Sequence, residues 1–321
     1  MTAGARRWAV GCRGVLMTCR HAALVVTSAL LLVPSALQGQ RSSPPDRCGM
    51  GVPPGEARAY VGLPSGNVFC PLVADPKAMR SFLSYLHEDE SADSIESVGS
   101  VGISDSFGLA RWGGNAKSDG VQLSIDGAIF AQFDLGSSSY DLINADYLIG
   151  LPLTIRKGGF STRLRIYHQS SHLGDELILR RNVMERENIS FEAAEFVLSI
   201  DASALRLYGG GEYLFHRQPR DLEHYVAHGG IELRPATELL RFGRIGFLRF
   251  LAAVDLKSSQ EQDWDPSVSL RAGFEIDRPF AGDLPARTWS ILFESYRGPS
   301  PYGQFFRQKI QFIGVGAHFA L

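Results

Sequence analysis

The sequence contains no long apolar run after residue 40. A helix that crosses a bilayer needs about 18 or more consecutive, largely apolar residues, so this absence excludes membrane-spanning helices beyond that point. The mean hydropathy of −0.04 gives no membrane signal either. Neither apolar run length nor mean hydropathy detects a β-barrel, because its strands alternate apolar and polar residues. The lack of apolar runs is therefore compatible with a membrane β-barrel.

The sequence also lacks an excess of charge of either sign, and it is poor in cysteine. It has 32 Lys and Arg residues against 34 Asp and Glu residues, for a net charge of −2, so we expect no nucleic-acid partner. Of its four cysteines, Cys12 and Cys19 lie in an N-terminal segment with the features of a signal peptide. Cys48 and Cys70 remain, and in an exported chain they either form one disulfide or stay as two thiols.

The first forty residues have the three regions of a secretory signal peptide. Four arginines between Arg6 and Arg20 precede an apolar stretch over Ala22–Val33, and small residues follow over Pro34–Gln40. This pattern predicts a cleaved signal over residues 1–39 and export to a bacterial outer membrane. The alternative is an uncleaved anchor helix, for which the apolar stretch is short.

Residues 40–77 are rich in proline and glycine, which favours an irregular, extended segment. We expect this segment to be a short periplasmic lead-in to the barrel, stapled by a Cys48–Cys70 disulfide.

From residue 78 onward, apolar and polar residues alternate. In residues 121–134 the apolar residues share one parity, and the opposite parity carries glutamine, serine and aspartate. Successive strand side chains point to opposite faces, so the pattern predicts amphipathic strands. The expected fold class is therefore all-β: a transmembrane antiparallel β-barrel of about twelve strands over residues 78–321. A soluble β-sandwich is the alternative.

Three features favour the membrane barrel over the sandwich. Many segments run ten residues or more, and the polar parity carries large charged groups of both signs. The last strand is apolar on one parity up to Phe319 and Leu321, which is typical of the signal read by the barrel assembly machinery. That machinery and outer-membrane lipids are the expected partners, and the sequence does not set an oligomeric state.

Connection lengths give the strand directions. The tight connections at 157–159 and 201–203 are expected in the periplasm, and the long one over 172–189 outside the cell. Counting strands backward from the C-terminus then requires one more strand before residues 95–110. Met79–Leu86 fits, which brings the total to twelve.

Several motifs carry a resemblance to a known family. They are Leu72–Pro76, Asp141–Tyr147, Arg163–Glu176, Tyr208–Tyr213 and Gly298–Phe305. Over nearly all of the mature chain the sequence resembles an uncharacterised bacterial family, catalogued as domain of unknown function 1207. The resemblance implies an outer-membrane barrel and no established activity.

A shorter motif is similar to a second family. His168-Gln169-Ser170 resembles the His-Gln-Ser core of outer-membrane phospholipase A, also a twelve-stranded barrel, where the histidine and serine face lipid. Here the parity of Leu164 and Ile166 likewise predicts His168 and Ser170 on the outer face. A serine beside a base is the minimum for acyl transfer.

The chain also departs from that motif. It continues Ser171-His172-Leu173-Gly174 in place of Ser-Asn-Gly, which leaves the third triad member and the oxyanion donors unassigned. On the next strand, Glu192 and Asn188 share the outward parity, and either could orient His168. Asp175 and Glu176 could bind Ca²⁺ under this hypothesis, or they are solvated loop charges. Otherwise we expect no cofactor.

The predicted inner face offers a second candidate site. Its polar residues could form a plug, line a narrow passage, or simply fill the barrel. They are Asn144, Asp146, Arg163, Arg165, Arg206, Glu212 and Arg271. The sequence thus leaves two functions open: a barrel with a structural or lumen-based role, or a lipid acyl hydrolase that uses His168, Ser170 and Glu192.

Overall fold

The computed structural model describes residues 59–89, 95–113, 119–181, 188–243, 246–278 and 287–320. The expected signal peptide, residues 1–39, and Cys48 lie outside these residues. The described elements are β1 (Tyr60–Gly62), β2 (Ser81–Glu88), β3 (Ser97–Trp112), β4 (Gly120–Asp134), β5 (Leu142–Lys157), β6 (Phe160–Leu173), α2 (Asp175–Arg181), β7 (Ile189–Ala202), β8 (Leu205–Gln218), β9 (Tyr225–Leu233), β10 (Leu240–Arg241), β11 (Phe247–Ser259), η1 (Gln260–Gln262), β12 (Pro266–Arg278), β13 (Arg287–Pro299), η2 (Gly303–Phe305) and β14 (Lys309–Ala320).

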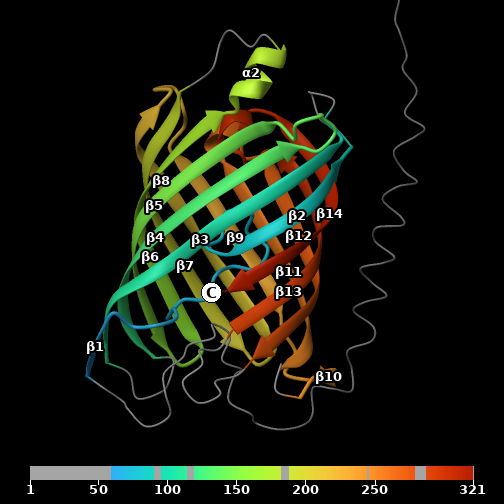
Figure 1. The fold of residues 1–321 in the computed structure, drawn as a ribbon. Coiled ribbons are helices and arrows are strands. Elements are labelled where there is room, and N and C mark those ends of the chain that lie inside the picture. Colours follow the sequence, from blue (N-terminus) through green and yellow to red (C-terminus); the bar gives the residue numbers. More distant parts are fainter. Residues whose placement is uncertain are drawn as a thin grey trace, which may run out of the picture. The chain divides into compact units, whose positions relative to one another are not determined.

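Twelve of the described strands form one closed antiparallel barrel (Figure 1). Each long strand pairs with a neighbour on both sides, and the β3–β4 pairing joins the two ends of the sheet. The short strands β1 and β10 pair at the edges of β3 and β11. Because β2 pairs with both β14 and β3, it is the first barrel strand that the count required. The prediction of an all-β barrel of twelve strands is confirmed.

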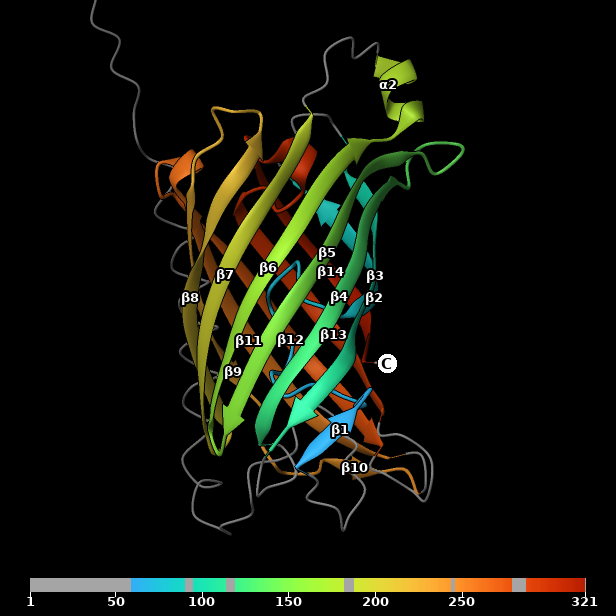
Figure 2. The ribbon, with the colours of Figure 1, turned by 90° about the vertical axis from the view of Figure 1, so that its left-hand side faces the viewer.

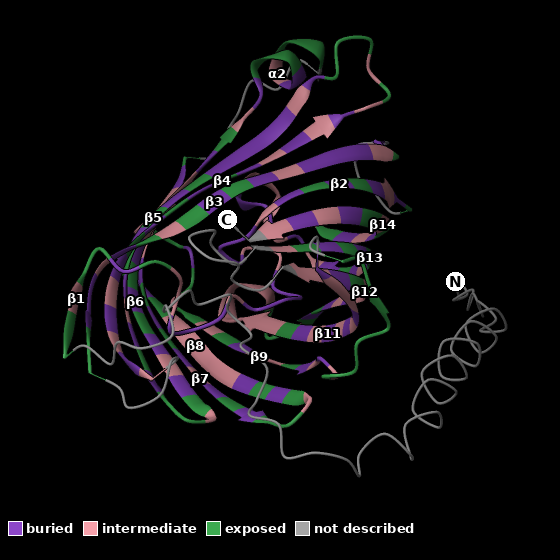
Figure 3. Ribbon diagram, turned by 60° about the horizontal axis from the view of Figure 1, so that its bottom comes forward, coloured by how far each residue is buried: buried purple, intermediate pink, exposed green. Residues whose placement is uncertain are grey.

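The strands alternate between an exposed apolar face and a buried polar face. On β4, for example, Ile125 and Ile129 are exposed, whereas Ser124 and Asp126, on either side of Ile125, are buried. Figure 3 shows the same alternation of buried and exposed residues along most strands. Exposed apolar side chains outside and polar side chains inside are the arrangement of a membrane barrel. Within the described residues, no helix has the length and apolarity to cross a membrane.

The two ends of the barrel differ in their connections. β5 and β6 are joined by two residues, Gly158 and Gly159, and β7 and β8 by Ser203 and Ala204. The helix α2 follows β6 at the opposite end from β1 and β10 (Figure 1). This agrees with the expected contrast between tight turns at one end and a long connection at the other.

The segment between β1 and β2 lies inside the barrel, which corrects part of the expected periplasmic lead-in. β1 pairs with the end of β3, and the chain then turns into the lumen, where Val68, Leu72 and Val73 have no exposed surface (Figure 2). Residues 64–80 are irregular, as expected, but they fill the barrel instead of lying below it. We call residues 64–80 the luminal segment.

The polar inner face explains why the luminal segment enters. Four inner-face arginines donate to its backbone carbonyls, which have no strand partners of their own, and the first of them, Arg111, bonds Ser65 O and Gly66 O. The other bonds run from Arg156 to Val68 O (2.9 Å), from Arg206 to Cys70 O (3.0 Å) and from Arg271 to Val73 O (2.9 Å). Cys70 is disulfide-bonded, and its expected partner, Cys48, lies outside the described residues.

Apolar side chains of the luminal segment meet apolar exceptions on the inner face. Leu72 packs in one buried cluster with Val197, and Val73 packs in another with Leu251 and Leu292. Burying a leucine or valine in this way stabilises the fold by about 1.5–3 kcal/mol each. The segment is therefore held by packing as well as by hydrogen bonds.

Candidate functional site

The outer wall carries a polar cluster near the end of the barrel that bears α2. On β6 the residues at 161, 163, 165 and 167 are buried, so His168 and Ser170 have the outward parity, as the sequence predicts. Both are half-buried among neighbouring outer-face side chains, and the His168 side chain is 40% exposed.

Glu192 is the residue that meets His168. The two lie directly opposite each other in the β6–β7 register, and His168 Nδ1 is 2.9 Å from Glu192 Oε1. Directly opposite residues of antiparallel strands are close enough for their side chains to interact. The second candidate, Asn188, instead donates to Gln218 at 3.3 Å.

His216 also joins the cluster, although strict alternation along β8 predicts it on the inner face. The register of β7 with β8 shifts after Glu192: Glu192 faces His216, and Ala193 faces Leu214, so Phe215 is an extra residue. This β-bulge turns His216 outward, where its Nδ1 lies 2.6 Å from Glu192 Oε2. The expected inward placement of His216 is therefore wrong.

The three side chains form a row across β6, β7 and β8, with the carboxylate between two imidazoles. A carboxylate that accepts the Nδ1 proton of a histidine leaves Nε2 as the basic nitrogen. Ser170 lies two residues beyond His168 on the same face and directly opposite Tyr147 of β5. Among the described residues, Ser170 makes no hydrogen bond to His168. Such contacts are often open in the absence of substrate.

The candidate cation ligands do not form a site. Asp175 and Glu176 begin α2, and both are exposed. In the described part of the chain, neither lies in a group of three histidine, cysteine or carboxylate ligands. The group that does exist, Asp75, His228 and Asp255, is buried in the lumen, with ligand atoms within 4.8 Å of one another. Lys257 Nζ is 3.8 Å from Asp75 and already supplies positive charge there.

The predicted luminal cluster lies inside the barrel, where most of its members form charged pairs. Glu195 joins Arg163 at 2.6 Å and Arg165 at 2.5 Å. Arg206 pairs with Glu232, and Arg271 with Glu294. Buried charges of this kind are tolerated because each has a partner.

The remaining members hold the luminal segment and one outer loop. Asp146 pairs with Lys77 of the luminal segment and accepts the backbone N–H of Gly303 in η2. Asn144 donates to Asp146 at 3.1 Å. Lys77 also lies 4.6 Å from the centre of the Phe130 ring. This network ties the segment to both the wall and the loop, so it is a structural core.

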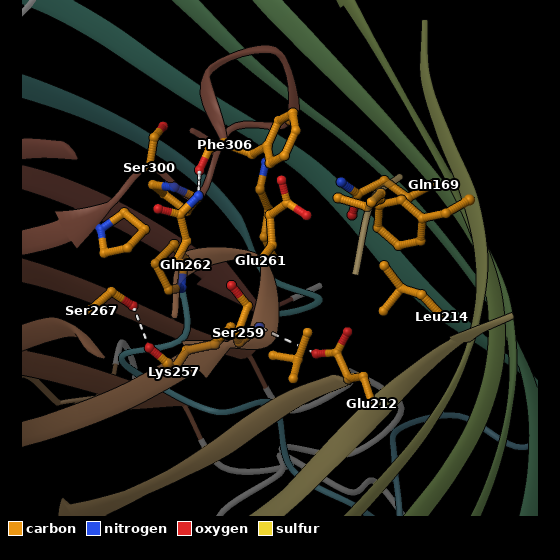
Figure 4. Close-up of a pocket in the computed structure, with 18 of the residues that line it drawn as sticks. Gln169, Glu212, Leu214, Lys257, Ser259, Glu261, Gln262, Ser267, Ser300 and Phe306 are labelled. Atoms are coloured by element: carbon orange, nitrogen blue, oxygen red, sulfur yellow. Dashed lines mark hydrogen bonds and ion pairs between the residues drawn. The ribbon is translucent and has the colours of Figure 1, made fainter. Parts of the chain in front are cut away.

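Above the luminal segment, a cavity of about 190 Å³ opens toward the end that carries η1 and η2. Glu212 and Lys257 line it and form an ion pair at 3.4 Å, and Gln262 of η1 donates to Phe306 O at 2.9 Å (Figure 4). The cavity ends at Asp75 and Lys77, so the luminal segment forms its floor.

Comparison with known proteins supports the fold. The family model described as a protein of unknown function, DUF1207, matches residues 51–321. No curated protein matches the chain. The solved outer membrane phospholipase A from Escherichia coli is similar, with a TM-score of 0.51 and 12% identity, over 75% of this chain and 90% of that one. The Salmonella typhi outer membrane phospholipase dimer with bound calcium has a TM-score of 0.48 and 12% identity, over 77% and 94%. At 12% identity, the likeness to the Escherichia coli protein shows the fold alone.

Proposed function

Because this chain belongs to DUF1207, a family of unknown function, its activity has to be argued from its own residues, and we propose that it is an outer-membrane lipid acyl hydrolase. The observation that carries the proposal is the contact of 2.9 Å between His168 Nδ1 and Glu192 Oε1, with Ser170 two residues along the same outer face. A carboxylate, an imidazole and a hydroxyl in this order are the parts of a nucleophilic triad.

In the proposed reaction, Ser170 Oγ attacks the ester carbonyl carbon of a lipid. His168 Nε2 takes the hydroxyl proton and gives it to the departing alcohol as the ester C–O bond breaks. A water molecule, deprotonated by His168, then attacks the acyl-serine carbonyl carbon, the bond to Ser170 Oγ breaks, and His168 returns the proton to Oγ as the fatty acid leaves. Glu192 stays ionised throughout and holds the imidazole in one orientation. His216 is a second donor to Glu192 and fixes the position of the carboxylate.

The location of the cluster suits a lipid substrate. It lies near the end of β6 that leads into α2, above an outer wall of exposed apolar side chains such as Leu164 and Ile166. In an outer membrane this places the cluster at the boundary between the outer leaflet and water. A lipid ester lies at that depth, so the substrate reaches the site by diffusion within the membrane.

The residues near Ser170 do not fit a calcium site made of protein carboxylates. Asp175 and Glu176 are adjacent and exposed, and no third carboxylate or histidine joins them within the described residues. Hard divalent cations take six or more oxygen ligands. We therefore derive no step through calcium.

The test is lipid turnover by the purified, refolded barrel in phosphatidylethanolamine and phosphatidylglycerol vesicles, with calcium and with a chelator. Fatty acid release is expected from the natural protein and from Ser190→Ala, a matched control whose serine lies directly opposite Ser170 on β7. Ser170→Ala is expected to lose activity by a factor on the order of 10⁶. Equal release by Ser170→Ala and the natural protein rejects Ser170 as the nucleophile.

A structural role without chemistry is the second candidate, and the filled lumen favours it. Val73 and Leu72 are fully buried within the barrel, and the inner-face charges are paired around the luminal segment. A barrel filled in this way does not act as an open pore. Absence of lipid turnover under all conditions, together with absence of ion conductance in planar bilayers, supports this role.

A further inference from the structure

The outer wall has a hollow beside His168 that the proposed catalysis leaves unused. Its volume is about 460 Å³, and the outward side chains that line it are Ile103, Ile125, Ile129, Tyr147, Ile149 and His168. They come from β3, β4, β5 and β6, so the hollow crosses four neighbouring strands. Asp126, Ala128 and Leu148 also border it, but their side chains are buried on the inner face, where Asp126 pairs with Arg165.

A missing side chain creates the hollow. Gly127 is exposed on the outer face of β4 between Ile125 and Ile129, and a Cβ at this position would meet no atom within 4 Å. Asp105 lies directly opposite Gly127 on β3 and is exposed on the same outer face, so it borders the hollow on that side, and its Oδ1 accepts the N–H of Ser106 at 2.8 Å. The space over Gly127 is therefore open, with isoleucines on most sides and Asp105 at its β3 border.

The hollow connects the candidate triad to the middle of the barrel wall. His168 faces Ile149 on β5, and Ile149 faces Gly127, which is the central residue of β4. Tyr147, another lining residue, is the direct neighbour of Ser170. The row thus starts near the outer end of β6 and reaches the mid-height of the strands. A lipid of the outer leaflet takes the same path, with its ester near the surface and its tail reaching toward the midplane of a core about 30 Å thick.

The geometry points to this hollow as the seat of one acyl chain of the lipid substrate, with the ester at Ser170 and the tail over Gly127. The assignment of the ester rests on the proposed function, whereas binding of the chain does not. The substrate class is a long-chain lipid ester, because a short, water-soluble ester does not reach Gly127.

The first test measures binding without catalysis. The refolded barrel is placed in phosphatidylethanolamine vesicles that contain a trace of the same lipid with a diazirine at the end of one acyl chain, and cross-links are mapped by mass spectrometry. Labelling of the peptides around Gly127 and Ile149 is expected at least several-fold above that of other outer-face peptides. Gly127→Leu, which fills the hollow, is expected to abolish this excess.

Gly209→Leu is the matched control. Gly209 is an outer-face glycine of β8, and a Cβ there meets its nearest atom, His228 O, at an ordinary 3.8 Å. This variant is expected to keep the excess labelling. Even labelling around the barrel, or an excess that survives in Gly127→Leu, rejects the hollow as the binding site of the acyl chain. So does a stable dimer whose contact face protects the hollow from label, because a second copy then covers it.

The second test compares esters of different length. Gly127→Leu is expected to lower the ratio of long-chain to butyryl ester turnover at least ten-fold, and Gly209→Leu to leave the ratio unchanged. An unchanged ratio in Gly127→Leu rejects the hollow as the acyl-chain site but leaves the proposed hydrolase activity in place. If the natural protein hydrolyses neither ester, the hydrolase fails, and the labelling experiment still decides whether the chain binds.

Discussion

Arg206 in the lumen and His168 on the outer wall show two uses of polar side chains in one barrel. Arg206 is fully buried, and its guanidinium donates to Ser199, to Glu232 and to the carbonyl of Cys70. The His168 side chain is 40% exposed, and its one polar contact with a described residue joins Nδ1 to Glu192. A group whose donors are occupied holds structure together, whereas a group with one free, accessible nitrogen can take a proton. We therefore expect luminal substitutions to change stability, and outer-wall substitutions to change rate.

The largest effect on rate is expected at His168. His168→Ala removes the base that activates Ser170, so lipid turnover should fall by a factor on the order of 10⁶. Its thermal unfolding midpoint should match that of the natural protein, because the side chain faces outward. A parallel loss of stability and activity breaks the comparison, since His168 would then be a structural residue.

Arg206→Ala is expected to have the largest effect on stability. It leaves Glu232 buried without its cation, although Glu232 still accepts the Val73 N–H at 2.8 Å. Removing one partner of a buried ion pair costs about 3–5 kcal/mol, which chemical unfolding in detergent measures. The exposed pair Arg241–Glu238 is the control, and Arg241→Ala should change stability by less than about 1 kcal/mol. Equal effects of the two substitutions contradict a structural lumen.

An intermediate effect on rate is expected at Glu192. Glu192→Ala removes the contact that orients His168 and should lower kcat by a factor on the order of 10⁴. Glu192→Gln keeps an acceptor for the Nδ1 proton and should recover part of that loss. If Glu192→Gln and Glu192→Ala have the same kcat, or if KM changes instead of kcat, Glu192 does not position the base.

The smallest effect is expected in α2. Asp175→Asn with Glu176→Gln alters two exposed charges that join no ligand group in the described residues. Turnover with calcium and with a chelator should stay within about twofold of the natural protein, as for other surface changes. A selective loss of calcium-dependent activity in this variant assigns a cation site to the start of α2.

The fold was predictable because period-two alternation persists through most of the chain. The same alternation places His168, Ser170 and Glu192 on one face, although it cannot state that Glu192 and not Asn188 meets His168. That choice depends on the strand register, which follows from the length and path of the connection after β6. His216 was missed because the bulge at Phe215 inverts the parity at one point, and one extra residue leaves no mark on the alternation.

The luminal segment was missed for a different reason. Its prolines and glycines indicate only an irregular chain, and nothing local in the sequence says where such a chain lies. The sequence does contain a weak signal. Some strand positions that point inward carry apolar residues, such as Val197, Leu251 and Leu292, and apolar side chains are unfavourable in a water-filled lumen. These residues pack against Leu72 and Val73. Inward apolar residues on the strands, taken together with apolar residues in the preceding irregular chain, predict that this chain enters the barrel as the luminal segment.

The most direct test of the division between lumen and wall is covalent labelling of Ser170. An alkyl fluorophosphonate reacts with a serine hydroxyl only where a neighbouring base activates it. In the folded barrel we predict one adduct, mapped by mass spectrometry to Ser170, and loss of that adduct in His168→Ala but not in Arg206→Ala. A folded, lipid-hydrolysing protein without an adduct at Ser170, or with equal labelling in His168→Ala, would contradict the assignment of catalysis to the outer wall.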